Sequence, residues 1–311
     1  VWGVIEDSGY PASALSQHPK NKEPIRTGVY VGVMYEEYSL FGVEQTLKGN
    51  PLTLWGSASS IANRVSYYCD FNGPSMAVDT MCSSSLTAIH LACKDLRLGE
   101  TDLAIAGGVN VSVHPNKYLA LSQGMFLSGR GRCESFGEKG EGFIPGEGVG
   151  AVLLKPLHKA EADGDQIYGI IKGSSLNHGG KTNGYTVPNP RAQSTVIREA
   201  MEKAGVTPKA ISYVEAHGTG TILGDPIEIA GLTKAYGTDK KQYCSIGSVK
   251  SNMGHGESAA GIAGLTKVLL QIQHKQLVPS LHSKTLNPNI DFTNSPFKVQ
   301  QKLEEWNTED N

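Results

Sequence analysis

Short β-rich runs alternate with longer segments of helical spacing along the whole chain. Strands are predicted at 76–80, 103–113, 149–154, 168–174, 211–216 and 245–249, because these runs are short, largely apolar and bounded by turn-forming or polar residues. Apolar residues at helical spacing predict helices over about 83–98, 192–204 and 258–274. Asp225 is expected to cap a further helix, since Pro226 and Glu228 follow it in a typical first turn. This alternation is typical of an α/β fold.

Two strand–helix units resemble each other and carry reactive residues at the same place. Cys82 follows the strand predicted at 76–80 and precedes a helix, and His255 lies between the strand predicted at 245–249 and the next helix. Open α/β sheets bind ligands at the carboxyl ends of their strands. The pattern therefore predicts two duplicated α/β halves, residues 1–158 and 159–311.

Composition narrows the possible partners and compartment. The 311 residues include 28 Lys+Arg and 30 Asp+Glu, a near-neutral balance that does not favour binding to nucleic acid. No apolar run approaches the roughly 18 residues that span a bilayer, and no signal peptide opens the sequence, so no membrane span is expected. The five cysteines include no CxxC pair, which favours a reduced, cytoplasmic protein.

Cys82 is the candidate nucleophile. It lies at or just before the first turn of the predicted helix, where unpaired N–H groups and the helix dipole lower the pKa of a thiol below its ordinary value of about 8.5. The small residues 83–85 leave room for a ligand. A buried structural role is the commoner one for cysteine, and Cys93 on the apolar helix face fits it. For Cys82, both roles remain open on position alone.

Two histidines lie at predicted strand ends. His217 and His255 are each followed by glycine, which lets a substrate chain come close. Either one alone would more often be a hydrogen-bonded structural residue, but the pair favours a site. Zinc is not favoured, because no HExxH or paired-cysteine spacing is present. The glycine-rich segment 137–150 lacks the GK[ST] ending of a phosphate loop, so a structured turn near the site is predicted.

Three motifs together resemble one family. They are Val-Asp-Thr-Met-Cys-Ser-Ser-Ser at 78–85, Glu-Ala-His-Gly-Thr-Gly-Thr at 215–221 with Gly-Asp-Pro at 224–226, and Gly-Ser-Val-Lys-Ser-Asn-Met-Gly-His at 247–255. In this order they resemble β-ketoacyl synthases of the thiolase superfamily, specifically ketosynthase domains of modular polyketide synthases, over essentially the whole chain. Residues 178–188 look like bacterial synthases whose acyltransferase acts in trans. The resemblance implies a thiolase-like fold, with the two halves in α-β-α-β-α layers.

The resemblance also implies a two-stage reaction at a Cys-His-His site. Cys82 would accept an acyl chain from the phosphopantetheine arm of an acyl carrier protein. A malonyl-type extender on a carrier would then lose carbon dioxide, and its enolate would attack the thioester in a decarboxylative Claisen condensation that elongates a polyketide. His217 and His255 would be N–H donors to the enolate oxygen.

Three further roles and the partners follow from the same resemblance. Lys250 is expected to orient the site through an ion pair with Glu228, and Thr219 and Thr221 to hydrogen-bond the pantetheine amides. No cofactor is expected to be bound by the domain itself. The expected partners are acyl carrier protein, acyl and malonyl-type thioesters, and a second copy in a homodimer.

Both ends differ from the family pattern. Residues 1–7 resemble the middle of a helix well inside the usual domain, and residue 311 precedes the Gly-Phe-Gly-Gly-Thr-Asn-Ala-His segment that contributes to the oxyanion hole. The expectation is a fold truncated at both ends, in which 1–311 is part of a longer polypeptide.

Two alternatives remain beside condensation. One is a non-elongating domain that docks carriers and holds an acyl chain, and the other is a Cys-His hydrolase that releases the chain to water. Non-elongating ketosynthases typically lack the histidine that matches His217. The two-histidine set also differs from the Cys-His-Asn set of initiating ketosynthases and from the second cysteine of degradative thiolases.

Overall fold

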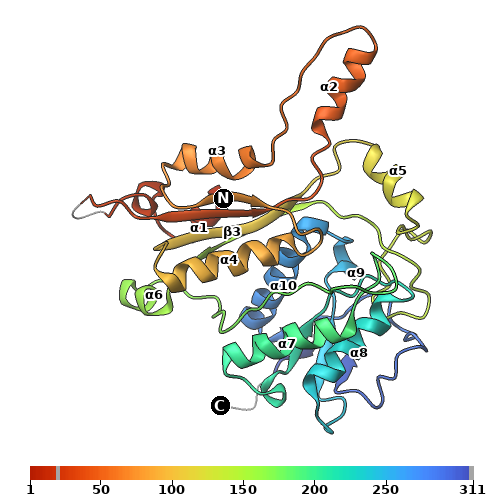
Figure 1. The fold of residues 1–311 in the computed structure, drawn as a ribbon. Coiled ribbons are helices and arrows are strands. Elements are labelled where there is room, and N and C mark those ends of the chain that lie inside the picture. Colours follow the sequence, from red (N-terminus) through yellow and green to blue (C-terminus); the bar gives the residue numbers. More distant parts are fainter. Residues whose placement is uncertain (19–21, 308–311) are drawn as a thin grey trace. The chain divides into compact units, whose positions relative to one another are not determined.

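The computed structural model describes residues 1–18 and 22–307, which form two compact units (Figure 1). Unit 1 comprises Val1–Gly124, Gly146–Ile167 and Gly256–Ala263, and unit 2 comprises Met125–Pro145, Tyr168–His255 and Gly264–Asn311. The halves predicted at 1–158 and 159–311 stay a prediction. Among the helices of the described residues, none combines the length and apolar character needed to cross a bilayer.

Unit 1 is built on a four-stranded sheet in the order β2-β1-β3-β4. Its strands are β1 (Thr27–Gly32), β2 (Ser75–Val78), β3 (Leu103–Asn110) and β4 (Gly148–Leu154). β1 pairs in parallel with β2 and β3, and β4 is antiparallel to β3. Gly32 pairs with Val78 on one side and Gly108 on the other, so the carboxyl ends of three strands meet at one edge.

Helices cover this sheet and complete the core of unit 1. Figure 1 shows α3 and α4 on opposite faces of the sheet. The helices are α1 (Trp2–Asp7), α2 (Tyr38–Leu47), α3 (Ser59–Cys69), α4 (Ser84–Leu98), α5 (Asn116–Gln123) and α6 (Leu157–Asp163), with 3₁₀ turns η1 (Ala12–Leu15) and η3 (Glu257–Ala259). Apolar residues of strands and helices, such as Val29, Ile105 and Ala62, form one buried cluster.

Unit 2 contains a parallel sheet in the order β5-β6-β8 and a short antiparallel pair, β7-β9. Its strands are β5 (Tyr213–Glu215), β6 (Cys244–Gly247), β7 (Gln276–Leu277), β8 (Phe297–Val299) and β9 (Glu304–Glu305). Its helical elements are α7 (Pro190–Ala204), η2 (Pro208–Ala210), α8 (Gly224–Tyr236), α9 (Lys250–Met253) and the greater part of α10 (Ala260–His274). Phe136, Ile229, Ile246 and Phe297 lie in its core.

Two local predictions are wrong. Residues 168–174 form no strand, and Gly173 packs so closely on α7 that a Cβ would lie 2.6 Å from the Ala200 carbonyl oxygen and 2.6 Å from the Ala204 nitrogen. Asp225 does not cap α8, since the helix begins at Gly224 after Leu223 and the aspartate side chain binds backbone elsewhere. The other predicted strands and helices are present, with bounds shifted by a few residues.

Candidate active site

Cys82 lies in the turn between β2 and α4, two residues before the helix begins. Its side chain is half-buried, and the cysteine is a thiol rather than a disulfide. Met81 adopts a left-handed backbone conformation with φ 59°, which costs about 1–2 kcal/mol for a residue with a Cβ. Asp79 accepts a hydrogen bond from the Met81 N–H at 2.8 Å, and Ser84 Oγ accepts one from the Thr80 N–H at 2.9 Å. These bonds hold the strained turn that presents Cys82.

The ends of β1 and β3 pack closely against the start of α4, which fixes the turn that contains Cys82 at the carboxyl edge of the sheet. A Cβ at Gly32 would lie 2.5 Å from the Ser85 nitrogen, and one at Gly108 would lie 2.8 Å from the Ser85 Cβ. Ser85 is fully buried, and its Oγ accepts a hydrogen bond from the Ile262 N–H at 3.1 Å. Any larger residue at the two glycines would therefore displace the start of α4.

The two predicted histidines lie together in unit 2. The rings of His217 and His255 are 5.2 Å apart between centroids and meet edge to face at 83°. His255 is almost completely buried, its backbone N–H donates to the Ile144 carbonyl at 2.7 Å, and its ring centroid lies 4.9 Å from that of Phe143. Residues 143 and 144 belong to the glycine-rich segment 137–150. The glycine-rich segment thus contacts His255, and its place near an active site stays a prediction.

A carboxylate fixes the backbone of the first histidine. Glu228 on α8 accepts hydrogen bonds from the N–H groups of His217 at 2.7 Å and Gly218 at 2.8 Å. Burial raises the pKa of Glu228, although these two bonds and the charge of Lys250 act against that shift. Lys250 begins α9 and is 4% exposed. Its predicted ion pair with Glu228 stays a prediction.

The environment keeps His217 neutral at pH 7. The surrounding protein and then the charge of Lys250 lower the pKa of this imidazole. A neutral imidazole carries one N–H, which can donate to a developing oxyanion.

The loop after His217 is held by Asp225, a residue whose role the sequence did not reveal. Its two carboxylate oxygens accept the Phe136 N–H at 2.7 Å and the Gly220 N–H at 3.1 Å. Burial raises the pKa of Asp225 to about 7. The hydroxyls of Thr219 and Thr221 lie 3.3 Å apart in this loop, and their role towards pantetheine stays a prediction.

Comparison with known proteins decides the family. The profile described as "Beta-ketoacyl synthase, N-terminal domain" matches residues 1–160, and "Beta-ketoacyl synthase, C-terminal domain" matches residues 168–284. The chain belongs to the beta-ketoacyl synthase family. By family it is thus a ketosynthase, and its resemblance to that family is confirmed.

Close relatives of this ketosynthase are polyketide synthases. It is 66% identical to polyketide synthase PksL of Bacillus subtilis over 98% of the chain, and 63% identical to polyketide synthase ThaG of Burkholderia thailandensis over 97%. It covers 7% and 5% of those two proteins.

Solved ketosynthases share its fold. The oxazolomycin ketosynthase domain OzmH KS7 of Streptomyces albus superposes with a TM-score of 0.93 at 54% identity. The ketosynthase from module 6 of the bacillaene synthase of Bacillus subtilis superposes with a TM-score of 0.90 at 44% identity. Both alignments cover 98% of this ketosynthase and 52% of the solved chain. The thiolase-like fold is therefore confirmed.

The predicted residues of the ketosynthase fall in both units. Unit 2 holds both histidines, Lys250, Glu228 and the two threonines, whereas unit 1 holds Cys82. Sequence reasoning missed Asp225 as an anchor and also Glu215, which binds Lys267 at 2.8 Å. A signal for the latter existed, because Lys267 is a charge within the apolar segment 258–274. Among the described residues, no group of three or more His, Cys, Asp or Glu could hold a metal ion.

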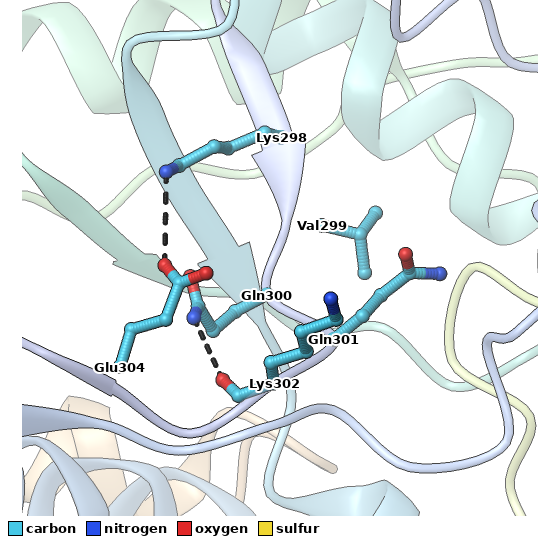
Figure 2. A pocket seen from close by; sticks show the side chains of 6 residues that line it. All are labelled: Lys298, Val299, Gln300, Gln301, Lys302 and Glu304. Atoms are coloured by element: carbon cyan, nitrogen blue, oxygen red, sulfur yellow. Dashed lines mark hydrogen bonds and ion pairs between the residues drawn. The ribbon is translucent and has the colours of Figure 1, made fainter.

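A separate hollow lies at the end of β8 (Figure 2). It is lined by Lys298, Val299, Gln300, Gln301, Lys302 and Glu304. Lys298 and Glu304 approach to 3.9 Å across it, and Gln300 Nε2 donates to the Lys302 carbonyl at 2.8 Å. None of the predicted site residues lines it.

Proposed function

We propose that this ketosynthase transfers an acyl chain to Cys82 and condenses it decarboxylatively with a malonyl-type extender during polyketide elongation. The observation that carries the proposal is the edge-to-face pair of His217 and His255, in which His217 is held neutral. Condensation needs N–H donors aimed at an enolate oxygen, and two imidazoles 5.2 Å apart fit that requirement.

The proposed reaction has two balanced stages. The Cys82 thiolate attacks the acyl thioester, and the carrier leaves as its phosphopantetheine thiol. A malonyl thioester then loses carbon dioxide, and the electron pair of the broken C–C bond forms an enolate whose oxygen accepts hydrogen bonds from His217 and His255. The enolate carbon attacks the acyl carbon, the Cys82 thiolate leaves, and a β-ketoacyl thioester remains on the carrier.

Other groups are assigned supporting roles. Lys250 orients the site with Glu228, and the hydroxyls of Thr219 and Thr221 bind the pantetheine amides. Polyketide synthase ketosynthases work with acyl carrier proteins, and we assign the delivery of both thioesters to such carriers. No resident cofactor is required by this chemistry. Segment 178–188 supports a synthase whose acyltransferase acts in trans.

A second copy of the chain is the remaining proposed partner. Helix α2 and the loop after it expose large apolar side chains, with Val43 53%, Leu47 83% and Trp55 90% exposed. Figure 1 shows α2 on an extended arm of unit 1. Burying such side chains against a second copy is favourable. Light scattering should report a homodimer, and Leu47→Asp should increase the monomer fraction; a wild-type monomer at micromolar concentration contradicts this assignment.

A non-elongating domain is the second candidate function. It shares the acyl-holding step but does not decarboxylate malonyl thioester. The presence of His217 beside His255 favours the elongating function, because holding an acyl chain requires the thiol alone.

Mass spectrometry after incubation with a small acyl thioester tests the proposal, in the longest polypeptide that carries this sequence. The peptide that contains Cys82 should gain the acyl mass, and Cys82→Ala should abolish the gain. Malonyl carrier protein should then release carbon dioxide. Acylation that survives Cys82→Ala overturns the assignment of the nucleophile. Acylation without decarboxylation indicates the non-elongating function, and steady release of free acid indicates a hydrolase.

A further inference from the structure

A largely buried carboxylate, that of Glu215, joins the two strands that lead into His217 and Lys250. β5 and β6 run in parallel with Glu215 opposite Gly247, and the last sheet bond joins the Ala216 N–H to the Gly247 carbonyl at 2.9 Å. Beyond this point the strands lead into His217 and Lys250. The Glu215 side chain continues the pairing, because its Oε1 accepts the Val249 N–H at 2.6 Å.

The other oxygen of Glu215 belongs to a closed triangle of polar groups. Oε2 accepts hydrogen bonds from Tyr213 Oη at 2.7 Å and Lys267 Nζ at 2.8 Å, and Lys267 Nζ also donates to Tyr213 Oη at 2.8 Å. The side chains of Lys267 and Glu215 are 8% and 11% exposed. Burial and the neighbouring Glu215 raise the pKa of Tyr213, so the phenol keeps its proton and remains a donor.

Two glycines leave space for this triangle. A Cβ at Gly247 would lie 2.9 Å from Tyr213 Oη and 3.3 Å from Lys267 Nζ, and one at Gly264 would lie 3.1 Å from Glu215 Cγ. A buried ion pair gives little net stability against an apolar replacement, because both charges lose water. The ion pair instead fixes orientation here, because Val249, Tyr213 and Lys267 together hold both oxygens of Glu215, two residues before His217.

We propose that Glu215, held by Lys267 and Tyr213, is a positioning residue that sets His217 and the Lys250 turn for decarboxylation. This role rests on the proposed function and extends it to a residue outside the proposed catalytic set. Glu215 precedes His217 by two residues and bonds the residue before Lys250. Moving its carboxylate would therefore shift both groups at once, whereas Cys82 belongs to unit 1.

The decisive variant is Glu215→Gln, measured separately for acyl loading and for decarboxylation of malonyl carrier protein. An amide can still accept the Val249 N–H, but its NH₂ then faces the Lys267 ammonium, where donor meets donor, and the Tyr213 O–H loses its acceptor. Displacement of a catalytic group by about 1 Å can cost about 10²-fold in rate. We expect kcat for decarboxylation to fall by about that factor, with KM and the rate of Cys82 acylation unchanged.

Unit 1 supplies a matched control. Tyr10, Lys155 and Asp165 form a similar triangle, with Lys155 Nζ 2.6 Å from Asp165 Oδ2 and 3.1 Å from Tyr10 Oη. Asp165→Asn removes the same kind of carboxylate from a place that touches none of the proposed site residues. It should leave both rates unchanged.

The double variant Glu215→Gln with Lys267→Met removes the contact between the two donors. It should recover part of the rate of decarboxylation that Glu215→Gln loses.

The outcomes separate the inference from the proposed function. A folded Glu215→Gln protein that decarboxylates at the wild-type rate overturns the inference, as does a loss of loading equal to the loss of decarboxylation. If Glu215→Gln does not fold, Tyr213→Phe can be tested instead, because it removes one donor with little change of shape. It should lower the rate of decarboxylation by a smaller factor and leave acyl loading unchanged. An unchanged rate of decarboxylation in Tyr213→Phe also overturns the inference. A wild-type protein that neither loads nor decarboxylates overturns the proposed function, and the inference with it.

Discussion

The Cys82 turn of unit 1 and the histidine loops of unit 2 are held in place by different physical means. Hydroxyls, one exposed carboxylate and close glycine contacts hold the Cys82 turn. Around the histidines, by contrast, carboxylates bond the backbone, as Glu228 does at His217, and Lys267 holds one of these carboxylates, Glu215. Unit 1 also has a buried ion pair, Lys117 with Glu257, but it joins α5 to η3 rather than to the Cys82 turn.

This difference has a chemical meaning. A nucleophile needs room and access, which small residues and a strained turn provide. Donors to an oxyanion need fixed direction, which buried ionic bonds provide. Steric changes in unit 1 should therefore affect loading first, and changes of charge in unit 2 should affect decarboxylation first.

The largest expected effect is the loss of a histidine donor. His217→Ala or His255→Ala should lower the rate of condensation by about 10²–10³-fold, as the loss of one oxyanion donor does in other enzymes, while Cys82 still gains the acyl mass. Single-turnover condensation and mass spectrometry measure the two steps. Loss of acylation in a folded histidine variant would contradict the division of roles between the units.

A steric change in unit 1 should act in the opposite way. Gly32→Ala places a Cβ 2.5 Å from the Ser85 nitrogen, and overpacking of this kind costs about 1–3 kcal/mol of the free energy of unfolding. Acylation of Cys82 should slow because the start of α4 is displaced. Gly3→Ala is the matched control, since its Cβ would meet nothing within 4 Å in α1. Equal rates of Cys82 acylation in Gly32→Ala and Gly3→Ala would contradict the claim that close packing in unit 1 positions the nucleophile.

The sequence predicted the strands and helices better than it predicted the side chains that hold the loops between them in place. Cys82, His217 and His255 were found because glycine, strand and helix patterns are local. Asp225 was assigned as an N-cap from the same local pattern, yet it bonds Phe136, 89 positions away in the chain. Partners so distant in sequence are brought together by the fold, and no periodicity encodes them.

The prediction of a strand at 168–174 was wrong for a related reason. Its apolar residues fit a strand, but Gly173 lies against the Ala200 carbonyl and the Ala204 nitrogen of α7. Glycine in a strand pattern can mark a close backbone approach instead of a pairing position. Which of the two applies depends on the packing partner, and the segment itself does not contain that information.

The buried carboxyl group of Asp225 in unit 2 should make the stability of the protein depend on pH. The pKa of Asp225 is raised from about 3.9 in the unfolded chain to about 7, so the folded state holds a proton that the unfolded state releases. This contribution is complete below about pH 4 and is lost as pH rises through 7, at up to about 1.4 kcal/mol per pH unit. Asp225→Asn should flatten the decline in urea unfolding measured between pH 5 and 8.

Asp291→Asn provides the control for this titration. Hydrogen bonds from Asn294 lower the pKa of Asp291, so that carboxyl is already ionised throughout the range from pH 5 to 8. Its replacement should leave the pH slope unchanged. A wild-type slope in Asp225→Asn would show that the buried aspartate does not carry the titration.

The smallest expected effect concerns an exposed ion pair of unit 1. Asp102 precedes β3 and lies 3.0 Å from Lys159, at the amino end of the sheet, opposite the edge where Gly32 and Gly108 contact the Cys82 turn. Exposed pairs contribute about 0–1 kcal/mol and are screened by salt. Asp102→Asn should therefore change the free energy of unfolding by less than about 1 kcal/mol, with the difference shrinking in high salt, and should leave acylation unchanged. A large loss of acylation would mean that charge also positions Cys82. The distinction between steric positioning in unit 1 and ionic positioning in unit 2 would then be wrong.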